Sequence, residues 1–117
     1  MVEQMVRMKT ASITYSVIRD DVVGKRNLEE SFGLTHADIA HVQVPNRVSG
    51  QAQLIPVSWS IGLTWRRPHS DSTHSTTFYL VPKEVLDIDM YLGSDDSGEG
   101  SPGVYTQCND YQVRPFG

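Results

Sequence analysis

The hydrophobic residues of this chain recur mostly at every second position, which is the spacing of β-strands. In the segment "ASITYSVI", residues 11–18, the side chains of Ile13, Tyr15 and Val17 fall on one side of an extended chain. The segment is therefore predicted to be a strand with one apolar face. The same alternation returns several times further along the sequence.

Four further segments show strand patterns. They are residues 40–48, 51–63, 76–82 and 86–93. In residues 51–63 the apolar face is formed by Ile55, Val57, Trp59 and Ile61. A proline cannot donate a backbone hydrogen bond, so Pro56 indicates an edge position or the start of a strand.

One segment, residues 19–34, has the looser spacing of a short amphipathic helix, which Gly24 weakens by about 1 kcal/mol relative to alanine. Residues 93–103 are rich in glycine, serine and acidic residues, a composition typical of flexible segments. We therefore predict a mostly β domain over residues 1–94 and a flexible acidic, glycine-rich tail over residues 95–117. A small closed or sandwiched barrel with one short helix is the simplest arrangement of these elements.

Length and charge exclude several classes of function. A chain of 117 residues suits one domain, and no apolar stretch approaches the roughly 20 residues that cross a bilayer. The formal net charge is −4, and the ten lysine and arginine residues are scattered, which argues against a nucleic-acid surface. We predict no membrane partner and no nucleic-acid partner. An intracellular, cytoplasmic location is expected, since the start of the chain lacks the pattern of a secretory signal.

The sequence offers little cofactor chemistry. Its single cysteine, Cys108, excludes an intrachain disulfide, and the spacing of the four histidines does not match the close ligand pairs of zinc sites. No metal and no cofactor are predicted. Trp59 lies on an apolar strand face and is predicted to belong to the core. Trp65, beside two arginines, is predicted to be an exposed contact, with cation–π stacking on a neighbour as the alternative.

The order of these elements resembles the retropepsin-like aspartic peptidase domain of eukaryotic retroelements, over about residues 10–94. The resemblance is most specific from Val57 to Gly93, where "V-x-W", "FYLVP" and "D-x-D-M-x-L-G" follow in the family's order. It implies a small acid-protease barrel with one short helix. It also implies a structural role for Leu92 and Gly93, which would end a strand beneath the active-site loop, where glycine permits close backbone approach. The alternative is a plain strand end with glycine in a turn.

The catalytic loop that this resemblance implies has lost its acid. The family uses two aspartates, one from each subunit, that share a proton, and each lies in an Asp-Thr-Gly or Asp-Ser-Gly loop. The loop should lie just before the letters "SVI", where we place a degenerate copy at Thr10, Ala11 and Ser12. No carboxylate occurs between Glu3 and Asp20. No catalytic residue is therefore assigned.

An Asp-Ser-Gly does occur at residues 96–98, which makes Asp96 a weak alternative for the catalytic aspartate. Its neighbours are acidic and solvated, and they offer no core that would perturb its pKa. The chain also has only nine residues before Thr10, so the family's first hairpin is shortened or replaced.

Two functions remain open at this point. The first is a catalytically inactive peptide-binding or assembly scaffold, whose flap groove at Val48, Ser49, Gly50, Gln51 and Ala52 would hold an extended peptide by strand addition. The alternative is an aspartic endopeptidase that acts as a homodimer, with its triplet missing from this version of the gene or supplied by a partner chain. A weak homodimer or an aggregation-prone monomer is expected, because a shortened first hairpin would expose strand edges.

Overall fold

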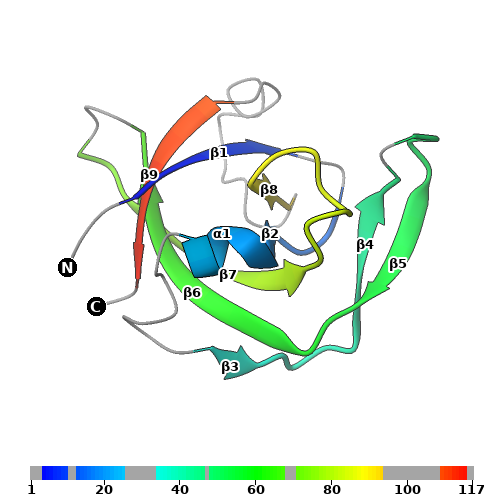
Figure 1. Ribbon diagram of the computed structural model, residues 1–117. Helices are drawn as coiled ribbons and strands as arrows, with labels where there is room; N and C mark the ends of the chain where they lie inside the picture. Colours follow the sequence, from blue (N-terminus) through cyan, green and yellow to red (C-terminus); the bar gives the residue numbers. More distant parts are fainter. Residues whose placement is uncertain are drawn as a thin grey trace.

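The computed structural model describes residues 4–10, 13–25, 34–46, 48–67, 71–93 and 109–115, and these residues form a mostly β protein with one short helix (Figure 1). Its elements in chain order are β1 (Gln4–Thr10), β2 (Val17–Arg19), α1 (Asp20–Lys25), β3 (Thr35–His36), β4 (His41–Pro45), β5 (Ala52–Pro56), β6 (Trp59–Arg66), β7 (His74–Val81), β8 (Met90–Leu92) and β9 (Asn109–Pro115). Within these ranges no helix is long and apolar enough to span a membrane.

Six of the strands close into a barrel. Their order is β6-β7-β2-β8-β1-β9, and a further pairing of β9 with β6 completes the ring. The pairs β1–β8 and β2–β7 are parallel, while the other pairs of the ring are antiparallel. Strand β3 pairs with β6 outside the ring, and β4 and β5 form a separate hairpin. The sequence prediction of a mostly β barrel with one short helix is confirmed.

The barrel interior holds the larger of two hydrophobic clusters. Alternate residues of β6 point inward, so that Ile61, Leu63 and Trp65 are all buried there. Helix α1 lies across the ring in Figure 1, and its Val22 and Val23 are buried in the same cluster. The acidic residues in the first turn of α1 suit the positive end of the helix dipole.

A second cluster lies between the barrel wall and the β4–β5 hairpin. Strands β2, β7 and β8 separate the two clusters, because their alternate residues point to opposite sides. On β8, for example, Met90 and Leu92 belong to the interior cluster while Tyr91 belongs to the second one. Val42 and Val44 of β4 pack into the second cluster from the other side. The hairpin is thereby held against the barrel by apolar contacts.

The predicted strand at residues 11–18 is wrong in part. Within its described portion only Val17 and Ile18 are extended, as the start of β2, and residues 13–16 form a bend. Ile13 and Val17 are buried as the alternation predicts, but the bend leaves Tyr15 with 40% of its surface exposed. The helix predicted over residues 19–34 is observed as the six residues of α1, and residues 26–33 lie outside the described part of the chain.

The two tryptophan predictions are also wrong. Trp65 is 1% exposed in the barrel core, and its indole N–H donates to the Thr76 hydroxyl at 3.0 Å. Strand register places it inward with Ile61 and Leu63 despite its arginine neighbours. Trp59 precedes the part of β6 that pairs with β7, so it lies beyond the core, 40% exposed and stacked on His36 of β3.

The predicted tail over residues 95–117 is wrong for residues 109–115, which form β9. Tyr111 and Val113 are 1% and 0% exposed in the interior cluster. The alternation of these two apolar residues with polar ones is a strand signal, but it is short and follows a long polar segment. The domain therefore extends beyond residue 94. Residues 94–108, Asp96 among them, lie outside the described part of the chain.

Candidate functional site

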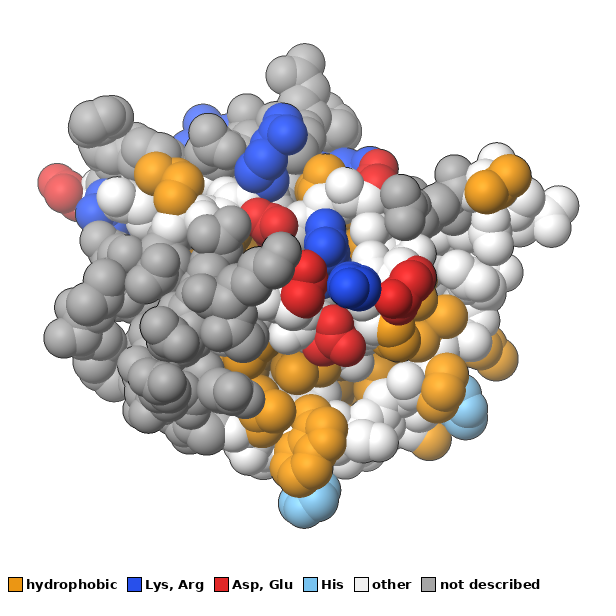
Figure 2. Space-filling model, in the orientation of Figure 1, with side chains coloured by type: hydrophobic (Ala, Val, Ile, Leu, Met, Phe, Trp, Pro, Cys, Tyr) orange, Lys and Arg blue, Asp and Glu red, His pale blue; other side chains and the backbone are white. Residues whose placement is uncertain are grey.

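The tip of the β4–β5 hairpin is ordered by a single asparagine. The side-chain Oδ1 of Asn46 accepts hydrogen bonds from the backbone N–H groups of Val48 at 2.8 Å and Ser49 at 3.0 Å. The Asn46 carbonyl accepts from Gly50 N–H at 2.8 Å, and Gly50 adopts a φ of 76°, which glycine tolerates best. Val48 is held with 96% of its surface exposed, and Figure 2 shows the tip projecting from the rest of the molecule.

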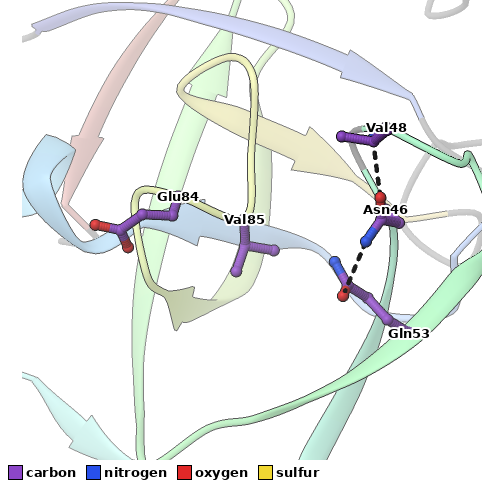
Figure 3. Close-up of a pocket in the computed structure, with 5 residues that line it drawn as sticks. All are labelled: Asn46, Val48, Gln53, Glu84 and Val85. Carbon is purple, nitrogen blue, oxygen red and sulfur yellow. Dashed lines mark hydrogen bonds between the residues drawn. The ribbon is translucent and has the colours of Figure 1, made fainter.

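A groove lies between this tip and the turn at residues 82–86. Its volume is about 480 Å³, and Asn46, Val48 and Gln53 line it from the hairpin. Glu84 and Val85 line it from the turn (Figure 3). The Asn46 amide donates to the Gln53 side-chain oxygen at 3.5 Å. The groove thus combines two valines, two amides and one carboxylate.

The predicted flap residues lie at or beside this groove, but only one of them lines it. Ser49, Gly50 and Gln51 form the turn, Ala52 begins β5, and Val48 reaches the groove. The sequence analysis did not single out Asn46, Gln53, Glu84 or Val85. The asparagine two residues before an exposed turn was the available signal for the hairpin side, whereas the approach of residues 84–85 to the tip has no local signature.

Gly93 lies close against the backbone of residues 14–16. A Cβ atom at this position would lie 2.7 Å from the carbonyl oxygen of Thr14 and 2.8 Å from the carbonyl carbon of Tyr15. The backbone N–H of Gly93 donates to the buried Ser16 hydroxyl at 2.9 Å, and Leu92 beside it is fully buried. Residues 14–16 therefore occupy the position against the Leu-Gly step that the sequence analysis assigned to residues 10–12.

The residues predicted as a degenerate catalytic loop lie elsewhere or are not described. Thr10 ends β1 and pairs with Leu92, and Ala11 and Ser12 lie outside the described residues. The segment that does face Gly93 reads Thr14-Tyr15-Ser16, which carries three hydroxyl groups and no carboxyl group.

A carboxylate, Asp87, lies on the outer side of β8 within a small polar network. The Tyr91 hydroxyl donates to Asp87 Oδ1 at 2.5 Å, and Lys9 Nζ lies 3.4 Å from Oδ2. Lys9 Nζ also lies 5.0 Å from the centre of the Tyr91 ring. Burial by itself raises the pKa of Asp87, but the hydrogen bond from Tyr91 and the charge of Lys9 outweigh it and lower the pKa below its ordinary value of 3.8.

A second carboxylate, Asp38, is held by another tyrosine near the bend. The Tyr79 hydroxyl donates to Asp38 Oδ1 at 2.7 Å, and the Tyr15 ring contacts the Tyr79 ring edge-on with centroids 5.6 Å apart. Both Asp38 and Asp87 thus face a phenol rather than a second carboxylate. Neither arrangement provides the proton shared between two carboxylates that aspartic peptidases need.

Metal chemistry finds no support in the described ranges, where no three histidine, cysteine, aspartate or glutamate side chains gather into a group that could hold an ion. Comparison of the chain with models of known families, with curated proteins and with solved structures finds no match. The groove and the bend that faces Gly93 are therefore the features of the molecule that bear on its function.

Proposed function

We propose that this chain is a catalytically inactive, retropepsin-like domain that binds an extended peptide in the groove beneath the β4–β5 hairpin, as a peptide-binding or assembly scaffold. The groove itself is the observation that carries the proposal. Its volume of about 480 Å³ lies within the range typical of ligand sites, and it opens between an exposed hairpin tip and a turn on the barrel.

The groove residues and the hairpin suit a peptide backbone. Within the described residues, β4 and β5 pair only with each other, so each has an edge to which a further strand can add. The amides of Asn46 and Gln53 both donate and accept hydrogen bonds, as peptide groups require. Val48 and Val85 offer apolar contacts to alternate side chains of the bound strand.

The absence of catalysis is inferred from the bend. Hydrolysis by a retropepsin-like mechanism needs a pair of carboxylates a few ångströms apart, one with a raised and one with a lowered pKa. The segment against Gly93 offers Thr14, Tyr15 and Ser16 instead. Loss of a principal catalytic group lowers the rate of hydrolysis by orders of magnitude. The groove residues that would hold a peptide do not depend on the missing carboxylates.

Binding is tested with a display library of peptides about eight residues long. This length is slightly more than that of a typical strand, so each peptide can pair along a whole edge of the hairpin. Selected peptides should shift the NMR resonances of Asn46, Val48, Gln53 and Val85. The variant Val48→Ser should weaken binding about fivefold, since it removes roughly 1 kcal/mol of apolar contact. Leu54→Ser is the matched control, because Leu54 is 65% exposed on the same hairpin but does not line the groove. Equal losses in both variants, or shifts elsewhere, would contradict the assignment.

Catalysis is tested separately by incubation with a broad peptide library between about pH 3 and pH 7, where shared-proton carboxylates titrate. We expect no cleavage that a pepstatin-like inhibitor blocks. Inhibitor-sensitive cleavage that disappears in the variant Asp96→Asn would refute inactivity and favour the alternative of a homodimeric aspartic endopeptidase.

A further inference from the structure

Strand β9 fills a slot in the barrel between β1 and β6. It forms five register pairs with β1, from Gln4↔Val113 to Met8↔Asn109, and four with β6. Figure 1 shows it crossing beside both strands at one side of the ring. Its removal would leave β6-β7-β2-β8-β1 as one continuous sheet with unpaired edges on β1 and β6.

The slot is apolar on its inner side. Tyr111 and Val113 enter the interior cluster, where the Tyr111 ring meets the Trp65 ring edge-on with centroids 5.4 Å apart. Val6 and Met8 of β1 are buried in the same cluster. A barrel without β9 would expose these side chains together with two open edges, so the slot strongly favours occupation by a strand of the same pattern.

The connection between β8 and β9 is much longer than the gap that it bridges. Thr10 pairs with Leu92 at the end of β8, and Met8 pairs with Asn109 at the start of β9, so the two ends that the connection joins lie two strand spacings and two residues apart, or about 12 Å. The intervening residues 94–108 would reach about 50 Å if fully extended. A connection of this length also allows β9 to reach the slot of a neighbouring molecule.

We propose that the slot between β1 and β6 is an interaction surface for β9 of a second copy of this chain, so that two copies exchange β9 and close each other's barrels. This route to a dimer does not use the groove. It also differs from the route expected from the sequence, because β1 already pairs with β8 over Met8–Thr10 on one edge and with β9 over Gln4–Met8 on the other.

The concentration dependence of the exchange follows from its contacts. β9 makes the same pairs in the exchanged dimer as in the monomer, so the equilibrium depends on the effective concentration of β9 near its own slot, on the order of millimolar for linked segments. The chain is therefore expected to be monomeric at low micromolar concentration. Sedimentation should show a dimer fraction that grows as the concentration approaches millimolar.

The exchange is tested by disulfide trapping between two full-length variants. Met5 and Gln112 are direct partners across β1 and β9, and Met5 is 44% exposed. Opposite residues of antiparallel strands are close enough for a disulfide. One chain carries Met5→Cys and the other Gln112→Cys, both with Cys108→Ser. After equilibration near millimolar concentration and oxidation, we expect a covalent heterodimer whose yield falls on dilution.

Two controls make the result decisive. A mixture of Met5→Cys and Val48→Cys chains measures collisional crosslinking, since Val48 is 96% exposed on a hairpin that does not pair with β9. The double variant with both Met5→Cys and Gln112→Cys should form an intramolecular disulfide and then lose the dimer in sedimentation. A heterodimer yield no higher than the collisional control, beside efficient closure of the double variant, overturns the proposal. Failure of that closure overturns the β1–β9 register on which the proposal rests.

Discussion

The six-stranded ring and the β4–β5 hairpin are built from the same alternating pattern, yet they use it differently. In the ring each strand has two neighbours, and inward residues such as Leu63 and Phe78 are completely buried. In the hairpin each strand has one neighbour among the described residues, and two apolar side chains are exposed, Val48 at the tip (96%) and Leu54 in the middle of β5 (65%). Apolar residues thus serve packing in the ring and are available for contact in the hairpin.

The difference explains why the candidate site lies where it does. Closing the ring removes its edges and satisfies its backbone groups, so little of it is left to recognise a ligand. The hairpin is attached through Val42 and Val44 on one face, which leaves its tip and edges accessible. Binding surfaces are commonly carried on such segments, positioned by a rigid scaffold. Substitutions in the two regions should therefore separate stability from binding.

The largest effect on stability is expected from Trp65→Ala in the ring. Loss of this buried side chain and of its hydrogen bond to Thr76 should lower the free energy of unfolding by about 3–5 kcal/mol, measured by urea denaturation. Leu54→Ala on the hairpin is the comparison and should change it by no more than about 0.5 kcal/mol. Similar losses in both variants would mean that ring and hairpin are equally important for stability.

A smaller effect is expected from Gly93→Ala, which places a Cβ against the backbone of Thr14 and Tyr15. Backbone atoms cannot move aside as a flexible side chain does, so the free energy of unfolding should fall by about 1–3 kcal/mol. Gly50 in the hairpin has open space around it, so Gly50→Ala is unfavourable only because of the positive φ. This substitution should lower the free energy of unfolding by about 1–2 kcal/mol. Thermal unfolding of both variants shows which substitution is more destabilising. An unchanged stability of Gly93→Ala would mean that the backbone of residues 14–15 can move away from the added Cβ.

The smallest effect on stability concerns Asp87 and appears as a pH dependence. Its pKa is lowered in the folded protein, so the stabilisation from Tyr91 and Lys9 is present above about pH 3.8 and is lost as the pH falls through the folded value. Because the side chain is 47% exposed, solvent limits the effect to no more than about 1 kcal/mol. Asp87→Asn should lower stability slightly at pH 7 and converge with the parent chain in acid. Parallel curves across this range would exclude a contribution from Asp87.

Much of the fold follows from local patterns, but its closure does not. The β-branched and aromatic residues of the segment 76–82 predict β7, and Val42 and Val44 predict the buried face of β4. The positions of Trp59 and Trp65 could not be predicted from their neighbours in sequence. They depend on where β6 begins to pair with β7, which is a long-range property of register.

The candidate site was predicted only in part for the same reason. An exposed turn with serine and glycine at residues 48–51 is visible in the sequence, and so is the glycine at the end of β8. The groove needs Glu84 and Val85 opposite that turn, and the bend at residues 14–16 becomes notable only when Gly93 is seen against it. Both are contacts between segments far apart in the chain, for which a single sequence gives no signal.

The pairing of β1 with β9 also sets the order in which the molecule can be assembled during synthesis. Gln4 pairs with Val113, 109 positions later (113 − 4), so β1 leaves the ribosome long before the strand β9 that pairs with it. Until then, β1 has only its parallel contact with β8, itself more than 80 residues away at Met8↔Met90. Contacts of such long range place a chain among slow folders, on the order of milliseconds to seconds. The nascent chain would spend that period with Val6 and Met8 uncovered, which makes it a natural client for chaperones that bind apolar segments.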